Sequence, residues 1–302
     1  MKYLSYELLD ALSAVVRNGS FAAAAEHLGV SQSAVSQRVK LLEERAGTPL
    51  VLRGRPCGAT QAGALLCRHL DDVRLLELDL LSNLPHVDAD VSERPVTVRL
   101  AVNSDSLASW FPEVVCRAGS ELGLRLAIVR DDQEHTVEML RSGEAMAAVT
   151  TEGARINGFR KTTLGTLDFL AVCAPQFHSE HFADGVTSEA LSRAPCLMFD
   201  NKDRLLHGWA RALLGQQVQL PGHWLPDLHG QIRALTAGGG WGMMPKHLIS
   251  GELDAGRLRE LVQERPFPVP LYWQYSTNSG RVLRDLAGIV RRTAHDMLQT
   301  TE

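Results

Sequence analysis

The sequence lacks any apolar run close to the roughly 20 residues that a membrane-spanning helix requires. Its first 16 residues are largely apolar but include Glu7 and Asp10, so they do not form the pattern of a secretory signal peptide. These absences predict a cytoplasmic protein without membrane contact.

Cysteine is scarce and follows no pattern. The five cysteines are scattered, odd in number and form no CxxC pair, which favours free thiols over a disulfide framework. The chain also has no GxSxG, HExxH or Walker motif and no cysteine–histidine spacing typical of metal sites. We therefore expect no enzyme, and predict no catalytic residue, no metal ligand and no cofactor.

A nucleotide-binding loop is also missing, although one glycine-rich run invites that interpretation. A dinucleotide loop follows a strand and opens a helix. The run Gly238–Gly242 instead follows an expected helix at 228–237 and opens an expected strand at 241–244. We interpret it as a tight reversal of the chain.

Positive charge is not in excess either. The formal net charge is −4, and residues 1–65 hold only seven lysines and arginines against five acidic residues. Charge alone therefore does not indicate a nucleic-acid partner. With 302 residues, 45% hydrophobic and 22% charged, the chain has the composition of two or three globular units.

The N-terminal third has the pattern of a small helical domain. Apolar residues at helical spacing predict helices over 5–17, 21–28 and 32–45. A β-prone piece at 50–53 and a turn at 54–58 follow them. Three helices followed by a small hairpin predict a winged helix over residues 1–59.

A long leucine-rich helix is predicted over residues 60–84. A helix of this kind between two domains usually pairs with a second copy of itself, although packing on its own domain is the alternative. Residues 85–95 are polar and bounded by prolines, which is typical of a hinge linker.

Strands and helices alternate from residue 96 to the C-terminus at 302, which predicts an α/β unit with a mostly parallel sheet. Among the expected elements are a strand at 96–102 followed by a helix at 106–121, and two separate strands at 159–164 and 167–173. The pattern leaves open whether this region forms one domain or two lobes.

The segment Phe21–Glu44 has the features of a helix-turn-helix. Small residues, Ala24 and Ala25, stand where two helices would cross, and Gly29 supplies the tight turn. The second helix has an apolar stripe of Val35, Val39 and Leu42 and an opposite polar face. An amphipathic surface helix without a DNA role is the alternative interpretation of this pattern.

The polar face is suited to DNA because glutamine reads base edges, while serine, arginine and lysine bind phosphates. The residues predicted to lie near bases are Gln32, Ser33, Ser36 and Gln37. Those predicted to lie nearer the DNA backbone are Arg38, Lys40 and Arg53, with Ser31 as the N-cap of the helix.

This motif resembles the signature of the LysR-type transcriptional regulators. The resemblance rests on Ala24-Ala25, Leu28, Val30–Ser36, Val39, Leu42-Glu43, Gly47–Leu50, Arg53, Thr60 and Gly63, and it covers residues 1–84. It implies a multidomain α+β protein: a winged helix-turn-helix, a dimerising linker helix and a two-lobed α/β domain resembling periplasmic binding proteins. Under this resemblance, lobe I spans about 96–166 and 271–302, and lobe II about 167–270.

The partners implied by the resemblance follow from that architecture. They are double-stranded DNA with a partly palindromic operator, and further copies of the chain, as a dimer or a tetrameric dimer of dimers. RNA polymerase is a further candidate partner. Such a protein would be associated with the nucleoid.

Several later stretches resemble the ArgP/LysG subgroup, which responds to lysine and arginine and controls their export. These stretches are Leu100–Trp110, Leu164–Leu170, Gly185–Thr187, Met198–Asp200 and Pro270–Trp273, whereas Asn201–Leu225 matches poorly.

Residue chemistry supports a basic amino acid independently. Open α/β sheets bind ligands at the carboxyl ends of strands, and a helix N-terminus favours a carboxylate. Acidic side chains would bind the ligand's cationic group, and a tryptophan would cover its aliphatic chain. The predicted effector residues are Asn103, Ser104, Asp105, Ser106, Trp110, Asp132, Thr150 and Asp200.

Each of three effector residues also has a purely structural interpretation: Asp105 as a helix N-cap, Asp132 in a solvated loop and Trp110 in the core. The predicted function is a DNA-binding regulator that senses lysine or arginine and controls an amino-acid export or metabolism gene. The alternatives are a regulator of a different effector and a constitutive nucleoid-type DNA binder. A solute-binding protein is disfavoured by the winged helix.

Overall fold

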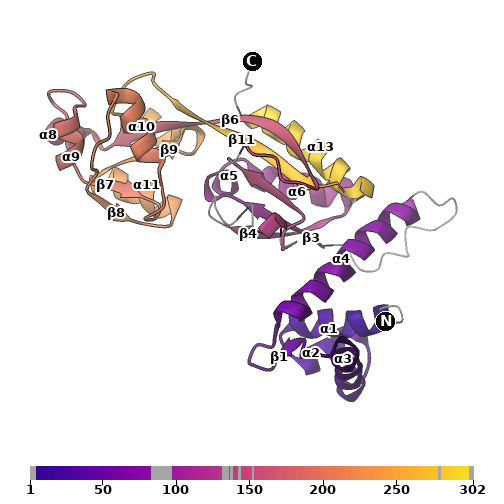
Figure 1. The fold of residues 1–302 in the computed structure, drawn as a ribbon. Coiled ribbons are helices and arrows are strands. Elements are labelled where there is room, and N and C mark those ends of the chain that lie inside the picture. Colours follow the sequence, from indigo (N-terminus) through magenta and orange to yellow (C-terminus); the bar gives the residue numbers. More distant parts are fainter. Residues whose placement is uncertain are drawn as a thin grey trace.

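The structure is a computed structural model that describes residues 5–82, 97–130, 136, 139–141, 144–151, 153–277 and 280–298. Figure 1 shows a small helical domain, a long helix and a larger α/β domain in two lobes. Within the described residues, no helix has both the length and the apolar character needed to cross a membrane. The predicted hinge linker at 85–95 lies outside the described residues.

The N-terminal domain is a three-helix unit with a small wing. Its elements are α1 (Tyr6–Asn18), α2 (Phe21–Leu28), α3 (Gln32–Ala46), β1 (Val51–Leu52) and β2 (Gly58–Ala59). Side-chain caps start two of the helices, because Ser20 accepts a hydrogen bond from the Ala23 N–H and Ser31 from the Ala34 N–H. Ala24 and Ala25 are buried between the helices, as the motif predicts.

Helix α4 (Gln61–Ser82) connects the two domains and packs on both. Leu70 belongs to the core of the winged helix, and Leu75 belongs to the core of the α/β domain. The long helix is thus confirmed. Its buried side packs on its own chain, which was the alternative interpretation, while Leu65, Leu76 and Leu80 remain exposed.

The first lobe of the α/β domain contains β3 (Thr97–Val102), α5 (Ser104–Ala108), α6 (Phe111–Leu122), β4 (Arg125–Arg130), β5 (Ala147–Thr150) and α13 (Gly280–Met297). The second contains α8 (Pro175–His181), α9 (Ser188–Arg193), β7 (Cys196–Met198), α10 (Leu205–Leu214), β8 (Gly222–Trp224), α11 (Leu228–Thr236), β9 (Trp241–Pro245), η2 (Lys246–Leu248), α12 (Ser250–Asp254) and β10 (Arg259–Glu260). Two long strands, β6 (Phe159–Cys173) and β11 (Phe267–Ser276), run between the lobes (Figure 1).

In the described part of the α/β domain, nine strands form one sheet in the order β4-β3-β5-β11-β6-β9-β7-β8, with β10 beside β6. Strand β3 is parallel to β4 and β5, and β7 is parallel to β8 and β9. The strands that connect the lobes are antiparallel to each other and to their neighbours β5 and β9. The prediction of a mostly parallel sheet was therefore wrong in the middle, because a chain that leaves one lobe and returns to it must run in both directions.

The single strand β6 also corrects the sequence prediction, which placed two strands here. Gly165 allows the strand to continue, with φ of +124° in a region that favours glycine. Its partner strand β11 changes register between Leu271 and Tyr272, opposite this point. This register shift therefore lies on the two strands that run between the lobes.

The helix expected at 106–121 is divided into α5 and α6. Pro112 lies at the start of α6, where it lacks the N–H that a continuous helix would need. The Ser109 hydroxyl donates to the Asp105 carbonyl at 2.5 Å, so a side chain closes the short helix α5. The break separates Asn103–Asp105 at the end of β3 from Trp110 in the core.

Candidate DNA interface and effector cleft

Helix α3 has a buried apolar side and an exposed polar side. Val35, Val39 and Leu42 are buried against α1 and α2, as the stripe predicts. The exposed predicted residues are Ser31, Gln32, Ser33, Ser36, Gln37 and Lys40. Both glutamines are therefore exposed to solvent on one helix, which has the dimensions to enter a major groove.

The basic residues of this surface have partners within the domain. Arg38 is half-buried and forms an ion pair with Glu7 of α1, and Lys40 Nζ lies 3.8 Å from Glu44 Oε1. Arg53 lies on the wing with its guanidinium 5.9 Å from the centre of the Phe21 ring. Arg53 is thus oriented beside the start of α2, while Arg38 mainly connects α3 to α1.

Glu43 is a positioning residue that the sequence did not single out for a role. Its carboxylate Oε1 accepts hydrogen bonds from the N–H groups of Leu50 at 2.8 Å and Val51 at 3.3 Å. This connects the last turns of the recognition helix to the first strand of the wing. No local pattern identifies the contact, because it depends on how the chain returns after Gly47.

A cleft of about 370 Å³ lies between the two lobes. The residues that line it are Asn103, Ser104, Asp105, Thr151, Leu167, Phe169, Phe199, Asp200, Lys202, Asp203, Arg204, Leu205, Leu228, Gln231, Met243, Val269 and Leu271. The first three extend from the carboxyl end of β3, as expected for an α/β sheet. Both lobes and the two crossing strands contribute, so lobe closure would change the shape of this space.

Four predicted effector residues, Asn103, Ser104, Asp105 and Asp200, line the cleft. Ser106 and Thr150 are buried and do not line it, and Thr151 takes the place expected of Thr150. Asp132 lies outside the described residues.

Trp110 is placed differently from the effector prediction. Its side chain is 0% exposed in the core of the first lobe and packs edge-to-face on Phe111, with ring centroids 5.5 Å apart. The reason is the break before α6, which turns residue 110 away from the strand end. The core interpretation of Trp110 therefore describes the structure.

The loop after β7 contributes Asp203, a cleft residue that sequence reasoning missed, beside the predicted Asp200. Asp203 accepts hydrogen bonds from the N–H groups of Phe199 and Leu205, and Asp200 accepts from those of Lys202 and Asp203. These bonds form a tight loop whose carboxylates face the cleft region. Lys202, Asp203 and Leu205 fall within Asn201–Leu225, where the resemblance was weakest.

Asp105 has unusual electrostatics for an acid at the edge of a cleft. Burial, and after it the neighbouring Asp203 carboxylate, raise the pKa of its carboxyl to about 7, while a backbone hydrogen bond acts in the opposite direction. Asn103, not Asp105, is the N-cap of α5. Asp105 is therefore available to a ligand, and a cation in the cleft would favour its ionised form.

Asn103 provides a second polar group, whose side-chain oxygen could still accept a hydrogen bond. Its Oδ1 is buried and has no hydrogen-bond partner among the described residues. A buried carbonyl oxygen without a donor is costly, so a ligand N–H placed here would remove that cost. The cleft therefore combines apolar walls with a few polar groups that converge, which is typical of a small-molecule site.

An exposed recognition helix joined to a two-lobed cleft domain defines the class of DNA-binding transcriptional regulators with an effector domain. Residues 6–64 match the bacterial regulatory helix-turn-helix protein model of the lysR family, and residues 93–294 match the LysR substrate binding domain. The chain belongs to the LysR family of transcriptional regulators and is not an enzyme.

Within this family the chain resembles the ArgP and LysG regulators. It is 40% identical over 278 residues to the transcriptional regulator ArgP of Pseudomonas fluorescens, covering 92% of this chain and 93% of that one. The crystal structure of ArgP from Mycobacterium tuberculosis matches with a TM-score of 0.76 and 37% identity, covering 99% of this chain and 100% of that one.

A further solved structure is the full-length LysG of Corynebacterium glutamicum with bound effector Arg. It matches with a TM-score of 0.64 and 32% identity, covering 98% of this chain and 100% of that one. The winged helix, the long helix α4 and the α/β effector domain thus follow the architecture of full-length family members.

Proposed function

We propose that this regulator senses arginine or lysine in the cleft between its lobes and controls transcription of an amino-acid export or metabolism gene. The observation that carries the proposal is the composition of the cleft. Three acidic residues, Asp105, Asp200 and Asp203, line it together with apolar side chains. The C. glutamicum LysG with bound effector Arg supports the choice of ligand.

The cleft offers a partner to each part of a basic amino acid. The side-chain cation would pair with Asp105 and Asp203, because opposite charges in a partly buried site attract strongly. The aliphatic chain would lie along Leu167, Phe169 and Met243.

The zwitterionic end of the ligand would meet a different group of residues. The α-carboxylate would accept from the Ser104 hydroxyl and pair with Lys202 or Arg204, and the ammonium would donate to Asn103 Oδ1. Helix α5 has only five residues, so the attraction expected from a helix N-terminus is small compared with these side chains.

The same proposal assigns roles to the rest of the chain. Residues 1–59 bind a partly palindromic operator, with Gln32, Ser33, Ser36 and Gln37 at the bases and Ser31, Arg38, Lys40 and Arg53 near phosphates. Residues 60–84 dimerise, 85–95 form the hinge linker, and 96–302 sense the effector. Dimers associate as tetramers in the cytoplasm, on the nucleoid, with RNA polymerase as a candidate partner.

Ligand binding would act by shifting the balance between open and closed lobes. Closure would change the packing of subunits and hence the spacing of two recognition helices along the DNA. A constitutive DNA binder would not need a polar cleft of this size with a buried, unpartnered acceptor.

The deciding experiment is calorimetric titration of the full-length protein with arginine, lysine and citrulline. Citrulline has the shape of arginine without its charge, so we expect binding of one or both basic amino acids and none of citrulline. Asp203→Asn should weaken binding, whereas Asp184→Asn, at an exposed position of the second lobe, should not. A flat trace with both basic amino acids would defeat the proposed effector and leave the family unaffected.

A further inference from the structure

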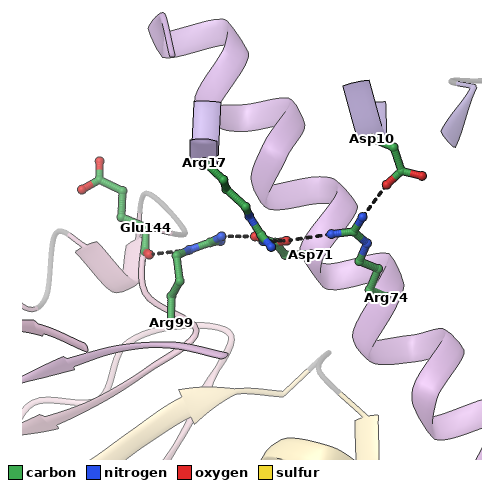
Figure 2. Close-up of polar contacts among 6 residues, drawn as sticks. All are labelled: Asp10, Arg17, Asp71, Arg74, Arg99 and Glu144. Atoms are coloured by element: carbon green, nitrogen blue, oxygen red, sulfur yellow. Dashed lines mark hydrogen bonds and ion pairs between the residues drawn. The ribbon is translucent and has the colours of Figure 1, made fainter. Parts of the chain in front are cut away.

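Asp71 lies where three parts of the protein meet. It belongs to the middle of α4, and its side chain is only 4% exposed. Figure 2 shows its carboxylate between Arg17, in the last turn of α1, and Arg99, on β3 of the effector domain. One acidic side chain thus contacts cations from both domains that α4 connects.

Each oxygen of Asp71 is engaged by a different domain. Arg17 Nη2 donates to Oδ1 at 2.5 Å, and Arg99 Nη1 donates to Oδ2. Arg99 is oriented further by its Nε, which donates to the Glu144 carbonyl at 3.0 Å. The carboxylate is therefore a bridge between the winged helix and lobe I, not a partner of either alone.

A third arginine completes the cluster. Arg74, one turn along α4, forms an ion pair with Asp10 of α1, and its Nη1 lies 3.9 Å from Asp71 Oδ1 (Figure 2). Three guanidinium groups thus gather around two carboxylates. Without Asp71, Arg17 and Arg99 would lose the carboxylate that joins them across the domain boundary, and their mutual repulsion would no longer be offset there, although the 44% exposure of Arg17 lets water screen part of it.

Arg99 also lies on the strand that leads to the effector cleft. Strand β3 ends at Val102, and Asn103, Ser104 and Asp105 follow it into the cleft. Lobe I is further attached to α4 through Leu75 in its core and through Asp79, which accepts from the Arg281 N–H at 3.2 Å. A change at the strand end therefore has a short, hydrogen-bonded route to α4 and α1.

We propose that Asp71 is a positioning residue that holds lobe I and the winged helix in one arrangement on α4, so that lobe II moves relative to both when a ligand closes the cleft. The tether alone is a statement about this fold; its role in effector response rests on the proposed function. Loss of Asp71 would let the recognition helix move independently of the ligand state.

The test compares full-length Asp71→Asn and Arg99→Gln with the conservative Asp71→Glu. Arg193→Gln is the matched control, because Arg193 forms an exposed ion pair with Glu189 within α9. Hydrogen–deuterium exchange is followed in peptides covering 14–20 and 97–102. Affinity for a duplex selected by the wild type from a random library is then measured with and without arginine or lysine.

We expect both peptides to exchange at least several-fold faster in Asp71→Asn and Arg99→Gln, and the effector-dependent change in DNA affinity to fall towards onefold. Asp71→Glu should return both the exchange rates and the effector-dependent change in affinity towards wild-type values. Arg193→Gln should match the wild type. Wild-type exchange in Asp71→Asn would overturn the tether, and a full effector response in that variant would overturn its role in coupling.

The two proposals fail separately. If the wild type itself binds neither amino acid, the proposed effector is wrong, and the exchange measurement, which needs no ligand, still decides whether Asp71 connects the domains.

Discussion

Asp105 is an acid that its surroundings keep protonated up to near neutral pH, where about half of it is ionised. Because its folded-state pKa is raised to about 7 by burial and then by Asp203, the folded protein holds a proton that the unfolded chain releases near pH 4. Its contribution to stability is therefore greatest below about pH 4 and decreases as pH rises towards 7.

This shift predicts a pH-dependent affinity for a basic ligand. A cation requires the ionised carboxylate, so binding releases a proton, and affinity should rise about tenfold per pH unit up to about pH 7 and then level off. Calorimetry between pH 5.5 and 8.5, in buffers of different ionisation enthalpy, measures both the slope and the proton release. Asp105→Asn should weaken binding and flatten the profile; an unchanged slope in this variant would assign the titration to another group.

Gln32 makes a prediction about DNA at the same scale. Its exposed side chain is placed to read a base edge, and a good bidentate contact contributes about 1–3 kcal/mol of discrimination. Gln32→Ala should therefore reduce the ratio of selected-site to random-duplex affinity by roughly five- to 150-fold. Lys40→Ala is the comparison, since loss of a phosphate contact should weaken both duplexes alike. A specificity ratio equal to that of the wild type would remove Gln32 from the base-reading set.

At the level of elements, the wing and α4 approach each other closely at Gly63. Gly63, in the first turn of α4, passes so close to the wing that an added Cβ would lie 2.1 Å from the Leu50 carbonyl oxygen. The glycine is needed for this approach, not for its backbone angles. This close approach fixes the direction in which α4 leaves the DNA-binding domain.

Gly63→Ala should force the wing away from α4 and destabilise the domain by about 1–3 kcal/mol. The measurement is thermal unfolding of the full-length protein together with duplex affinity, both of which should decrease. Gly251→Ala in α12 is the matched control, because a Cβ there meets nothing within 4 Å. Equal behaviour of the two variants would show that α4 adjusts at no cost.

At the scale of the whole molecule, α4 has one side buried on its own chain and another exposed. Leu65, Leu76 and Leu80 are exposed, and their spacing places them within roughly 60° of one another around the helix. A stripe of exposed leucines on a long helix is the pattern of a helix that pairs with a copy of itself.

The double variant Leu76→Glu/Leu80→Glu should therefore shift the protein to monomers in sedimentation velocity and reduce its affinity for a two-half-site duplex far more than for a single half-site. Leu41→Glu, at an exposed leucine of α3, controls for the added charge and should leave the sedimentation unchanged. A stable dimer of the stripe variant would place the subunit interface elsewhere.

What the sequence alone determined is local. The recognition helix, its buried stripe and its polar face follow from helical periodicity, a cap at Ser31 and a glycine at position 29, all within a few residues of each other. The cleft position followed almost as directly, because residues after a buried strand such as β3 must lie at the sheet edge.

Only the tertiary structure decided which side chains meet over long distances. Trp110 lies in the core because Pro112 breaks the helix before α6. Asp203 lies near Asp105 because the loop after β7 lines the cleft opposite the end of β3. Asp71 lies 54 residues from Arg17 and 28 from Arg99 in the sequence. Periodicity describes a residue's neighbours along one element. Contacts such as these depend on how separate elements pack against each other, and local sequence patterns do not specify that packing.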